Sequence, residues 1–246
     1  MLHTFEFNGK KLINIGAVIT EPPHYTISMR ELEFTALPKK SGDVVVDKKR
    51  FKNKTMFYKI SSLPLLCSYT EQQFVNILSE WLLTSYEYKV LRDTYNLGYF
   101  RKAVCTEISD PKVDATGVVS ATVTFNCDPF LYNNNGVKPI TQSGTGTFTL
   151  KNLEQWSSEP IITVNGNGDF TVNVNGESFD ITLNGNAVVI DKPAENVYYL
   201  STKAACNDII TASELPELKP DMNTIQVTTT SGTGFTMSIV PDWRRL

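Results

Sequence analysis

The residues of this chain that can do acid–base chemistry are scattered along its 246 residues. Four aspartates stand beside the turn-forming residues Pro, Asn, Thr or Gly, namely Asp93, Asp110, Asp128 and Asp169. Turn formation accounts for a carboxylate in that context. Two carboxylates from distant positions can still be brought together as a glycosidase pair. A glycoside hydrolase therefore stays open as a rival class, and it would lose turnover when a single Asp or Glu is replaced.

The nucleophilic and metal-ligating residues form no recognisable motif. The four cysteines lie far apart without a CxxC pair, and only two histidines, His3 and His24, accompany Cys67, Cys105, Cys127 and Cys206. No G-x-S-x-G elbow and no Walker loop occurs, and Gly166 with Gly168 lacks the third glycine of a dinucleotide-binding loop. We predict no catalytic residues, no metal site and no cofactor, small buried thiols in a reducing compartment, and a hairpin turn at the two glycines.

One segment of the first half predicts a helix. Thr70 can cap its N-terminus, Gln73 completes a capping box, and Glu71 suits the first turn. Five apolar residues then follow at helical spacing and form one stripe: Phe74, Ile77, Leu78, Trp81 and Leu82. We expect this stripe to cover a sheet.

The remaining patterns predict strands. Asn8 and Gly9 favour a tight hairpin turn after residues 5–7. Apolar residues alternate over 25–29 and, in the opposite phase, over 32–36, so we predict a β-bulge near Arg30 and Glu31. After residue 136 the chain consists of short alternating runs with Asn-Gly pairs at 165–166, 175–176 and 184–185. Trp156 is expected in the core because Leu153 lies nearby.

The character of the chain changes across residues 120–136, where a strand stops at Asp128 and Pro129 and a run of three asparagines follows. We predict a mostly β protein with a minor α element. Residues 1–132 would form an α+β domain with one helix on a sheet. Residues 133–246 would form an antiparallel β-sandwich.

Composition excludes several classes of function. A formal net charge of −3 gives no general reason to expect sequence-specific nucleic-acid binding, and no apolar run approaches the roughly 20 residues that cross a bilayer. The first residues lack the layout of a secretion signal, so we expect synthesis and retention in a cytoplasm. Two local features stand out instead. One is the basic run 38–54, and the other is the terminal WRRL.

The order of local patterns resembles the distal tail protein of long, flexible-tailed bacteriophages, the phage tail component family. The resemblance runs end to end. In the first half it rests on residues 5–10 (FEFNGK), 41–43 (SGD), 91–96 (LRDTYN), 99–103 (YFRKA) and 125–130 (FNCDPF). In the second half it rests on residues 160–166 (PIITVNG), 189–191 (VID), 216–218 (PEL) and 243–246 (WRRL).

The resemblance implies a structural virion protein and not an enzyme. First domains would form a homo-hexameric ring at the end of the tail tube, with the tail tube protein on one side and the tail-tip protein on the other. DNA would pass through the channel. The second domain would be galectin-like and project outward, where some relatives hold receptor-binding or baseplate proteins. The expected location is the virion tail tip, after assembly in the bacterial host cytoplasm.

Ring formation needs an interface in which one patch meets a different patch of the neighbour. We predict that the basic run crosses this interface and meets acidic residues there through Lys48, Lys49, Arg50 and Lys52. A second hypothesis is that Trp243, Arg244 and Arg245 close the ring or the domain boundary, since Trp and Arg anchor interfaces. The alternative function is a monomeric carbohydrate-binding module for host cell-wall sugars, in which one exposed aromatic residue carries the affinity.

Overall fold

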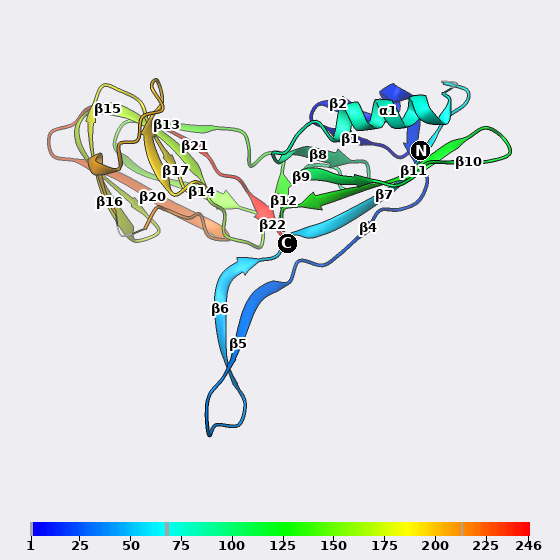
Figure 1. Cartoon of the computed structure of the whole chain (residues 1–246). Helices are drawn as coiled ribbons and strands as arrows, with labels where there is room; N and C mark the ends of the chain where they lie inside the picture. The colour runs from blue at the N-terminus through cyan, green and yellow to red at the C-terminus, as the bar shows by residue number, and fades with distance from the viewer. Residues whose placement is uncertain (1, 67–68, 213) are drawn as a thin grey trace. The chain divides into compact units, whose positions relative to one another are not determined.

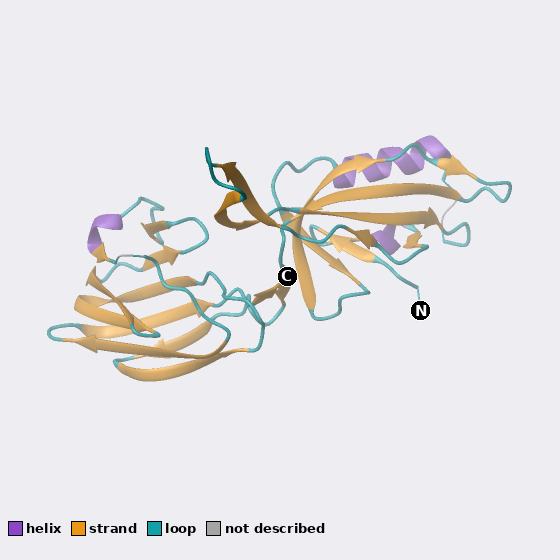
Figure 2. Cartoon of the chain, turned by 90° about the horizontal axis from the view of Figure 1, so that it is seen from below, coloured by secondary structure: helices purple, strands orange, loops and turns teal. Residues whose placement is uncertain are grey.

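The computed structural model describes residues 2–66, 69–212 and 214–246, so Cys67 lies outside the described chain. Two compact units are present, one formed by Met1–Leu131 with Leu246 and the other by Tyr132–Arg245. Strands dominate both units in Figures 1 and 2, and α1 (Glu71–Leu82) is the α-helix of the described residues. The predicted β-rich fold with a minor α element is therefore confirmed.

The first unit is built on one antiparallel sheet in the order β2-β1-β8-β9-β11-β7-β3. Its strands are β1 (Phe5–Phe7), β2 (Lys10–Lys11), β3 (Ala17–Ile19), β7 (Lys54–Ser62), β8 (Lys89–Asp93), β9 (Tyr99–Ile108) and β11 (Val119–Cys127). Two short strands add to its sides, because β4 (His24–Tyr25) pairs with β7 and β10 (Lys112–Val113) pairs with β11. A 3-10 turn, η1 (Leu12–Ile15), links β2 to β3.

The first hairpin has the predicted tight turn. Asn8 and Gly9 both take positive φ, at 49° and 78°, and Phe7 pairs with Lys10 across the turn. Two consecutive positive φ angles define the turn whose twist matches that of antiparallel strands. Asn tolerates this conformation better than most residues, which is why the turn could be predicted.

Helix α1 starts as predicted. The Thr70 hydroxyl accepts a hydrogen bond from the backbone N–H of Gln73 at 3.3 Å. The Gln73 side-chain oxygen accepts one from the backbone N–H of Thr70 at 3.0 Å. The predicted stripe faces inward, with Phe74, Leu78 and Leu82 fully buried. Two capped N–H groups and one apolar face therefore place the helix against the sheet.

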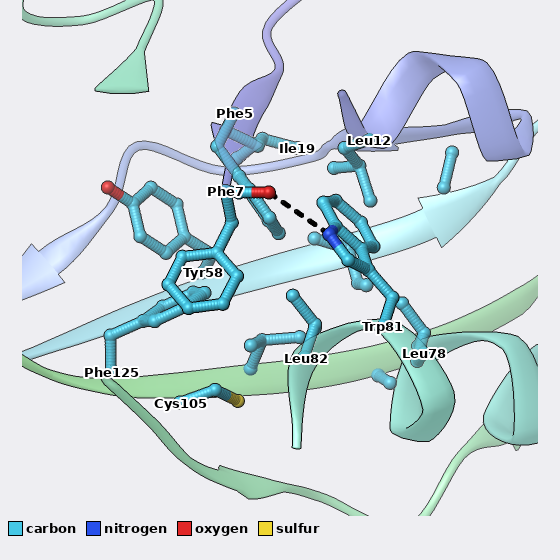
Figure 3. Packing of buried hydrophobic residues seen from close by; sticks show 14 of the residues in the cluster. Phe5, Phe7, Leu12, Ile19, Tyr58, Leu78, Trp81, Leu82, Cys105 and Phe125 are labelled. Atoms are coloured by element: carbon cyan, nitrogen blue, oxygen red, sulfur yellow. Dashed lines mark hydrogen bonds between the residues drawn. The ribbon is translucent and has the colours of Figure 1, made fainter. Parts of the chain in front are cut away.

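The core beneath α1 is aromatic (Figure 3). Phe5 stacks on Trp81 with ring centroids 5.6 Å apart. The rings of Tyr58 and Phe125 also pack on Phe5, with centroid distances of 5.2 and 5.6 Å. The indole Nε1–H of Trp81 donates a hydrogen bond to the backbone carbonyl of Phe7 at 3.1 Å. Strand β1 is thus held to the helix by ring packing and by one buried polar contact.

Strands β5 (Arg30–Ala36) and β6 (Asp43–Phe51) pair with each other as a separate two-stranded sheet. Figure 1 draws them as a long hairpin ribbon. The ladder shifts register between Arg30 and Leu32, which confirms the predicted bulge. The strand predicted for residues 25–29 is wrong beyond Tyr25, because Ile27 and Met29 lie outside any strand.

The second unit is an antiparallel sandwich. Its strands are β13 (Ile140–Ser143), β14 (Gly146–Asn152), β15 (Ile161–Val174), β16 (Glu177–Asn184), β17 (Val188–Asp191), β18 (Asn196–Tyr199), β19 (Ile210–Thr211), β20 (Asp221–Thr229) and β21 (Thr233–Val240). A 3-10 turn, η2 (Asn207–Ile209), precedes β19, and the short strands β12 (Leu131–Asn133) and β22 (Arg244–Arg245) pair with each other. Inward-facing residues of the long strands form one continuous core.

Strand β15 belongs to both layers of the sandwich. Its first residues, from Ile161 to Val164, lie between β17 and β21, whereas its last residues, Phe170 to Val174, lie between β16 and β20. The change of partners falls at Gly166 and Gly168, whose φ angles are 159° and 99°. Strands that pass from one sheet to another do so through such bends.

The hairpin turn predicted at Gly166 and Gly168 is therefore wrong, and Asn165 lies within β15. The other two Asn-Gly pairs do follow strand ends, at Asn175 after β15 and at Asn184 in the last position of β16. A Cβ at Gly168 would come within 2.8 Å of the Cα of Gly232. Close backbone approach, and not a turn, explains this glycine.

Replacing Trp81 with Phe tests the contact that joins helix and sheet. The variant leaves the buried carbonyl of Phe7 without its donor, so we expect a loss of about 1–3 kcal/mol in the free energy of unfolding. Denaturant unfolding followed by circular dichroism measures it. Tyr86→Phe is the control, because Tyr86 is 91% exposed. Equal stability of the Trp81→Phe variant and the wild type would contradict a role for this hydrogen bond.

Candidate assembly surfaces

Three ion pairs join charged side chains across the β5–β6 hairpin. Lys48 forms an ion pair with Glu33, and the Nε of Arg50 lies 2.7 Å from a carboxylate oxygen of Glu31. The hydrogen bond from Arg50 lowers the pKa of Glu31. Arg30 lies 3.4 Å from Asp47 on the opposite strand. These cross-strand pairs are exposed, so each contributes little to stability.

Two of the four cations predicted at the interface form no ion pair among the described residues. Among the described residues, neither Lys49 nor Lys52 has a side-chain ion pair, and both are exposed. Lys49 stands at a positive φ of 57°, where its backbone N–H donates to Asp47 at 2.9 Å. Lys52 is held only through its backbone, which donates to the carbonyl of Met29 at 2.8 Å. Seven basic and four acidic residues in 30–52 leave the hairpin cationic.

The same hairpin exposes a row of apolar side chains. Phe34 pairs with Val45 across the ladder, and they are 62% and 54% exposed. Further exposed apolar residues lie on the hairpin or on the segment leading into it: Tyr25, Ile27, Met29, Leu32, Leu37, Val44 and Val46. Because successive residues of a strand point to opposite faces, Leu32, Phe34 and Val45 share one face of the hairpin and Val44 and Val46 lie on the other. Exposed apolar side chains gathered on one element mark an interaction site. We call these residues, with Phe34 and Val45, the hairpin apolar surface.

The sequence-based hypothesis for this hairpin identified its charges and missed its apolar residues. Alternation of Leu32, Phe34 and Ala36 was visible in the sequence, but it predicts only that one face is buried. Which body buries that face depends on tertiary structure. Here no described part of the chain covers the hairpin, since Phe34 keeps most of its surface.

The terminal segment is used inside the second unit. Trp243 is 8% exposed and belongs to the sandwich core, and Arg244 is 9% exposed. The guanidinium of Arg244 donates to the carbonyl of Ser157 and to the carboxylate of Glu159, both at 2.8 Å. The docking hypothesis for Trp243, Arg244 and Arg245 stays a prediction, but the first two side chains already have partners within their own unit.

A close backbone approach holds this segment in place. Gly136 accepts a hydrogen bond from the N–H of Asp242 at 2.7 Å, and Asn133 donates to the carbonyl of Trp243 at 2.9 Å. A Cβ at Gly136 would lie 2.4 Å from the backbone nitrogen of Trp243. Only glycine fits here, so the end of the sandwich is closed by backbone contact.

The outer face of the sandwich carries a shallow polar hollow of about 250 Å³ between β15, β16 and β20. Asp169 accepts a hydrogen bond from Thr182 at 2.7 Å, and Asp180 accepts one from Thr171 at 2.6 Å. Its one aromatic lining residue, Phe170, is buried in the core. The hollow therefore lacks the exposed stacking ring that sugar binding would use. Trp156, which was expected in the core, is only partly buried, and the neighbouring Leu153 on which that expectation rested is 78% exposed.

The described residues contain no group of three or more His, Cys, Asp or Glu side chains that could hold a metal ion. His3 stacks on Tyr95 with ring centroids 4.3 Å apart, and His24 is exposed on β4. Cys105, Cys127 and Cys206 are free and buried. Burial raises the pKa of Cys105 to about 11 and that of Cys127 to about 12. Within the described chain, no helix has the length and hydropathy that a membrane span needs.

This architecture, a one-helix β unit followed by a sandwich, is the fold of a hub protein of phage tails. One solved structure with this fold is SPP1 Dit (gp 19.1), described as a paradigm of the hub adsorption apparatus in phages that infect Gram-positive bacteria. The two chains superpose with a TM-score of 0.70 over 97% of this chain and 98% of that chain, at 14% sequence identity. No family model matches the sequence, and no curated protein matches it.

The buried thiols make a testable prediction. A thiolate is the reactive form, so raised pKa values keep Cys105 and Cys127 inert at pH 8. In a Cys67→Ser background we expect no thiol of the native protein to react with a disulfide reagent within minutes. All three remaining thiols should react in concentrated guanidinium. Rapid native reaction of even one thiol would show that these side chains are more accessible than described.

Proposed function

We propose that this chain is the distal tail hub protein of a long-tailed bacteriophage. It would be a structural virion protein without catalytic activity, forming a hexameric ring that joins the tail tube to the tail tip. The observation that supports this most is likeness in fold to the SPP1 hub protein over 97% of the chain. A match over both units is stronger support than a shared sandwich alone, because sandwiches serve many functions.

In this proposal the first unit makes the ring and leaves a channel for DNA. The tail tube protein would dock on one side of the ring and the tail-tip protein on the other. The second unit would serve as the attachment point for receptor-binding or baseplate proteins. Its assignment as an attachment module, rather than a sugar-binding one, is supported by the polar hollow, whose carboxylates are engaged by Thr171 and Thr182.

The β5–β6 hairpin is the part of the first unit best suited to hold neighbours together. A two-stranded hairpin alone is marginally stable in water, and this one exposes Phe34 and Val45 on one face. A second copy of the same chain is the occupant that a ring would supply. Contact with that copy would bury the hairpin apolar surface. Lys49 and Lys52, which have no ion pair in the described chain, would then meet acidic groups of the neighbour.

The oligomeric state tests the proposal directly. We expect light scattering after size exclusion to give about six times the 27.5 kDa mass of one chain at the higher concentrations. Electron micrographs of the same fraction should show closed rings. A monomer at every concentration, also after addition of the tail tube and tail-tip proteins from the same phage, would contradict the ring. Glycan screening of that monomer would then test the carbohydrate-binding alternative.

One double substitution in the hairpin tests the apolar part of the interface. In Phe34→Ser with Val45→Ser, the concentration for half-assembly should rise at least tenfold, which corresponds to about 1.4 kcal/mol. The monomer should stay folded, because these side chains are already exposed. Leu153→Ser removes an exposed leucine of the second unit and is the control. Unchanged assembly of the hairpin variant would exclude the apolar contact.

The charged contact needs its own comparison. Lys49→Glu with Lys52→Glu should weaken assembly, since it reverses the two cations left for the neighbour. The exchange of Glu33→Lys with Lys48→Glu keeps one ion pair within the hairpin and should leave assembly nearly unchanged. The opposite order of effects would show that Lys48, rather than its unpaired neighbours, contacts the next subunit.

A further inference from the structure

Two cations of the first unit are buried on the same side of its sheet. Lys54 and Arg101 are 7% and 6% exposed. Lys54 at the start of β7 pairs in register with Cys127 of β11, and Cys127 pairs with Ala103 of β9. Arg101 lies two positions from Ala103, so it points to the same face as Ala103. The register therefore brings both cationic side chains to one end of the inner face.

Two of the three guanidinium nitrogens of Arg101 lack hydrogen-bond partners. Its Nε and Nη1 atoms are buried without an acceptor. Lys54 donates one hydrogen bond, to the backbone carbonyl of Pro129 at 2.7 Å, and forms no ion pair in the described chain. Burial and the nearby Arg101 lower the pKa of Lys54 to about 8. Arginine stays protonated at any ordinary pH, so the charge of Arg101 cannot be avoided by titration.

The nearest carboxylates are already engaged. Asp93 accepts the hydroxyl of Tyr58 at 2.7 Å with one oxygen, and its other oxygen accepts the backbone N–H groups of Tyr95 and Asn96 at 2.9 Å. Asp128 accepts the N–H of Phe130 at 2.9 Å at the end of β11. These bonds hold Asp93 and Asp128 in their turns. Two N–H donors of Arg101 therefore stay buried without an acceptor, which costs stability and is retained where something else supplies one.

We propose that Arg101 and Lys54 form an oxyanion site at this end of the first unit. A guanidinium presents parallel N–H donors that match a carboxylate or phosphate, and the ammonium of Lys54 adds a second charge. The oxyanion has two sources, a carboxylate side chain of a neighbouring copy or free phosphate. The first source rests on the proposed ring, whereas the second does not.

Arg101→Met tests the site, because methionine keeps an unbranched apolar stem and removes the charge. Without oxyanions, the isolated chain should melt at the same or a higher temperature than the wild type, since an unpaired buried charge has been removed. An arginine that merely supports its own unit would give a lower melting temperature. Arg92→Met is the matched control, because Arg92 on β8 is more exposed and lies 3.5 Å from Glu6.

Phosphate at constant ionic strength separates the two sources. If free phosphate is the ligand, it should raise the melting temperature of the wild type and of Arg92→Met by a few degrees, and this shift should vanish in Arg101→Met and Lys54→Met. If the ligand is a carboxylate of a second copy, phosphate has no effect and both variants raise the concentration for half-assembly at least tenfold. The site would be overturned if Arg101→Met lowered the melting temperature and changed neither the response to phosphate nor the concentration for half-assembly. If the wild type stayed monomeric and phosphate raised its melting temperature through Arg101, the ring would be refuted and the oxyanion site would stand.

Discussion

A strand of this protein is stable when one of its two faces is buried, and almost every long strand meets this condition within its own unit. In the first unit the cover is α1, whose Trp81 packs on Phe5 and donates to the carbonyl of Phe7. In the second unit the two layers of the sandwich cover each other, and β15 joins them because its first part pairs with β17 and its last part with β16. Strands β5 and β6 are the exception, because Phe34 and Val45 remain exposed. The hairpin therefore points to burial by another molecule, which is the physical reason to expect assembly.

The charged side chains of the first unit also differ in whether they have partners. On the hairpin, Arg50 and Lys48 are matched by glutamates across the ladder, so their pairing adds rigidity and little net attraction for a distant partner. Arg101 represents the opposite case, a buried guanidinium with two unsatisfied nitrogens. Exposed pairs lose little when they are rearranged, whereas a buried unpaired cation lowers stability until it is neutralised. In the proposed oxyanion site, that loss would be removed when an oxyanion binds.

The accuracy of the sequence-based predictions followed how local each feature is. The helix, its capping box, the turn at Asn8 and Gly9 and the bulge near Arg30 depend on residues a few positions apart, and all were predicted correctly. The turn at Gly166 and Gly168 was wrong. A positive φ suits a bend within a strand as well as a turn, and the deciding contact is the approach of Gly232, which lies more than 60 residues away along the chain.

The sequence by itself determined the strand and helix periods, the absence of a recognisable catalytic motif and a resemblance to a hub protein of phage tails. These follow from residue type and spacing, which act through local sterics and alternation of faces. Only the tertiary structure decided which apolar faces are covered. It placed Trp243 in the core of the sandwich, buried Arg244 against Ser157 and Glu159, left Leu153 and Phe34 exposed, and buried Arg101 beside Lys54. Burial is a property of what approaches from elsewhere in the chain, and no local pattern encodes that approach.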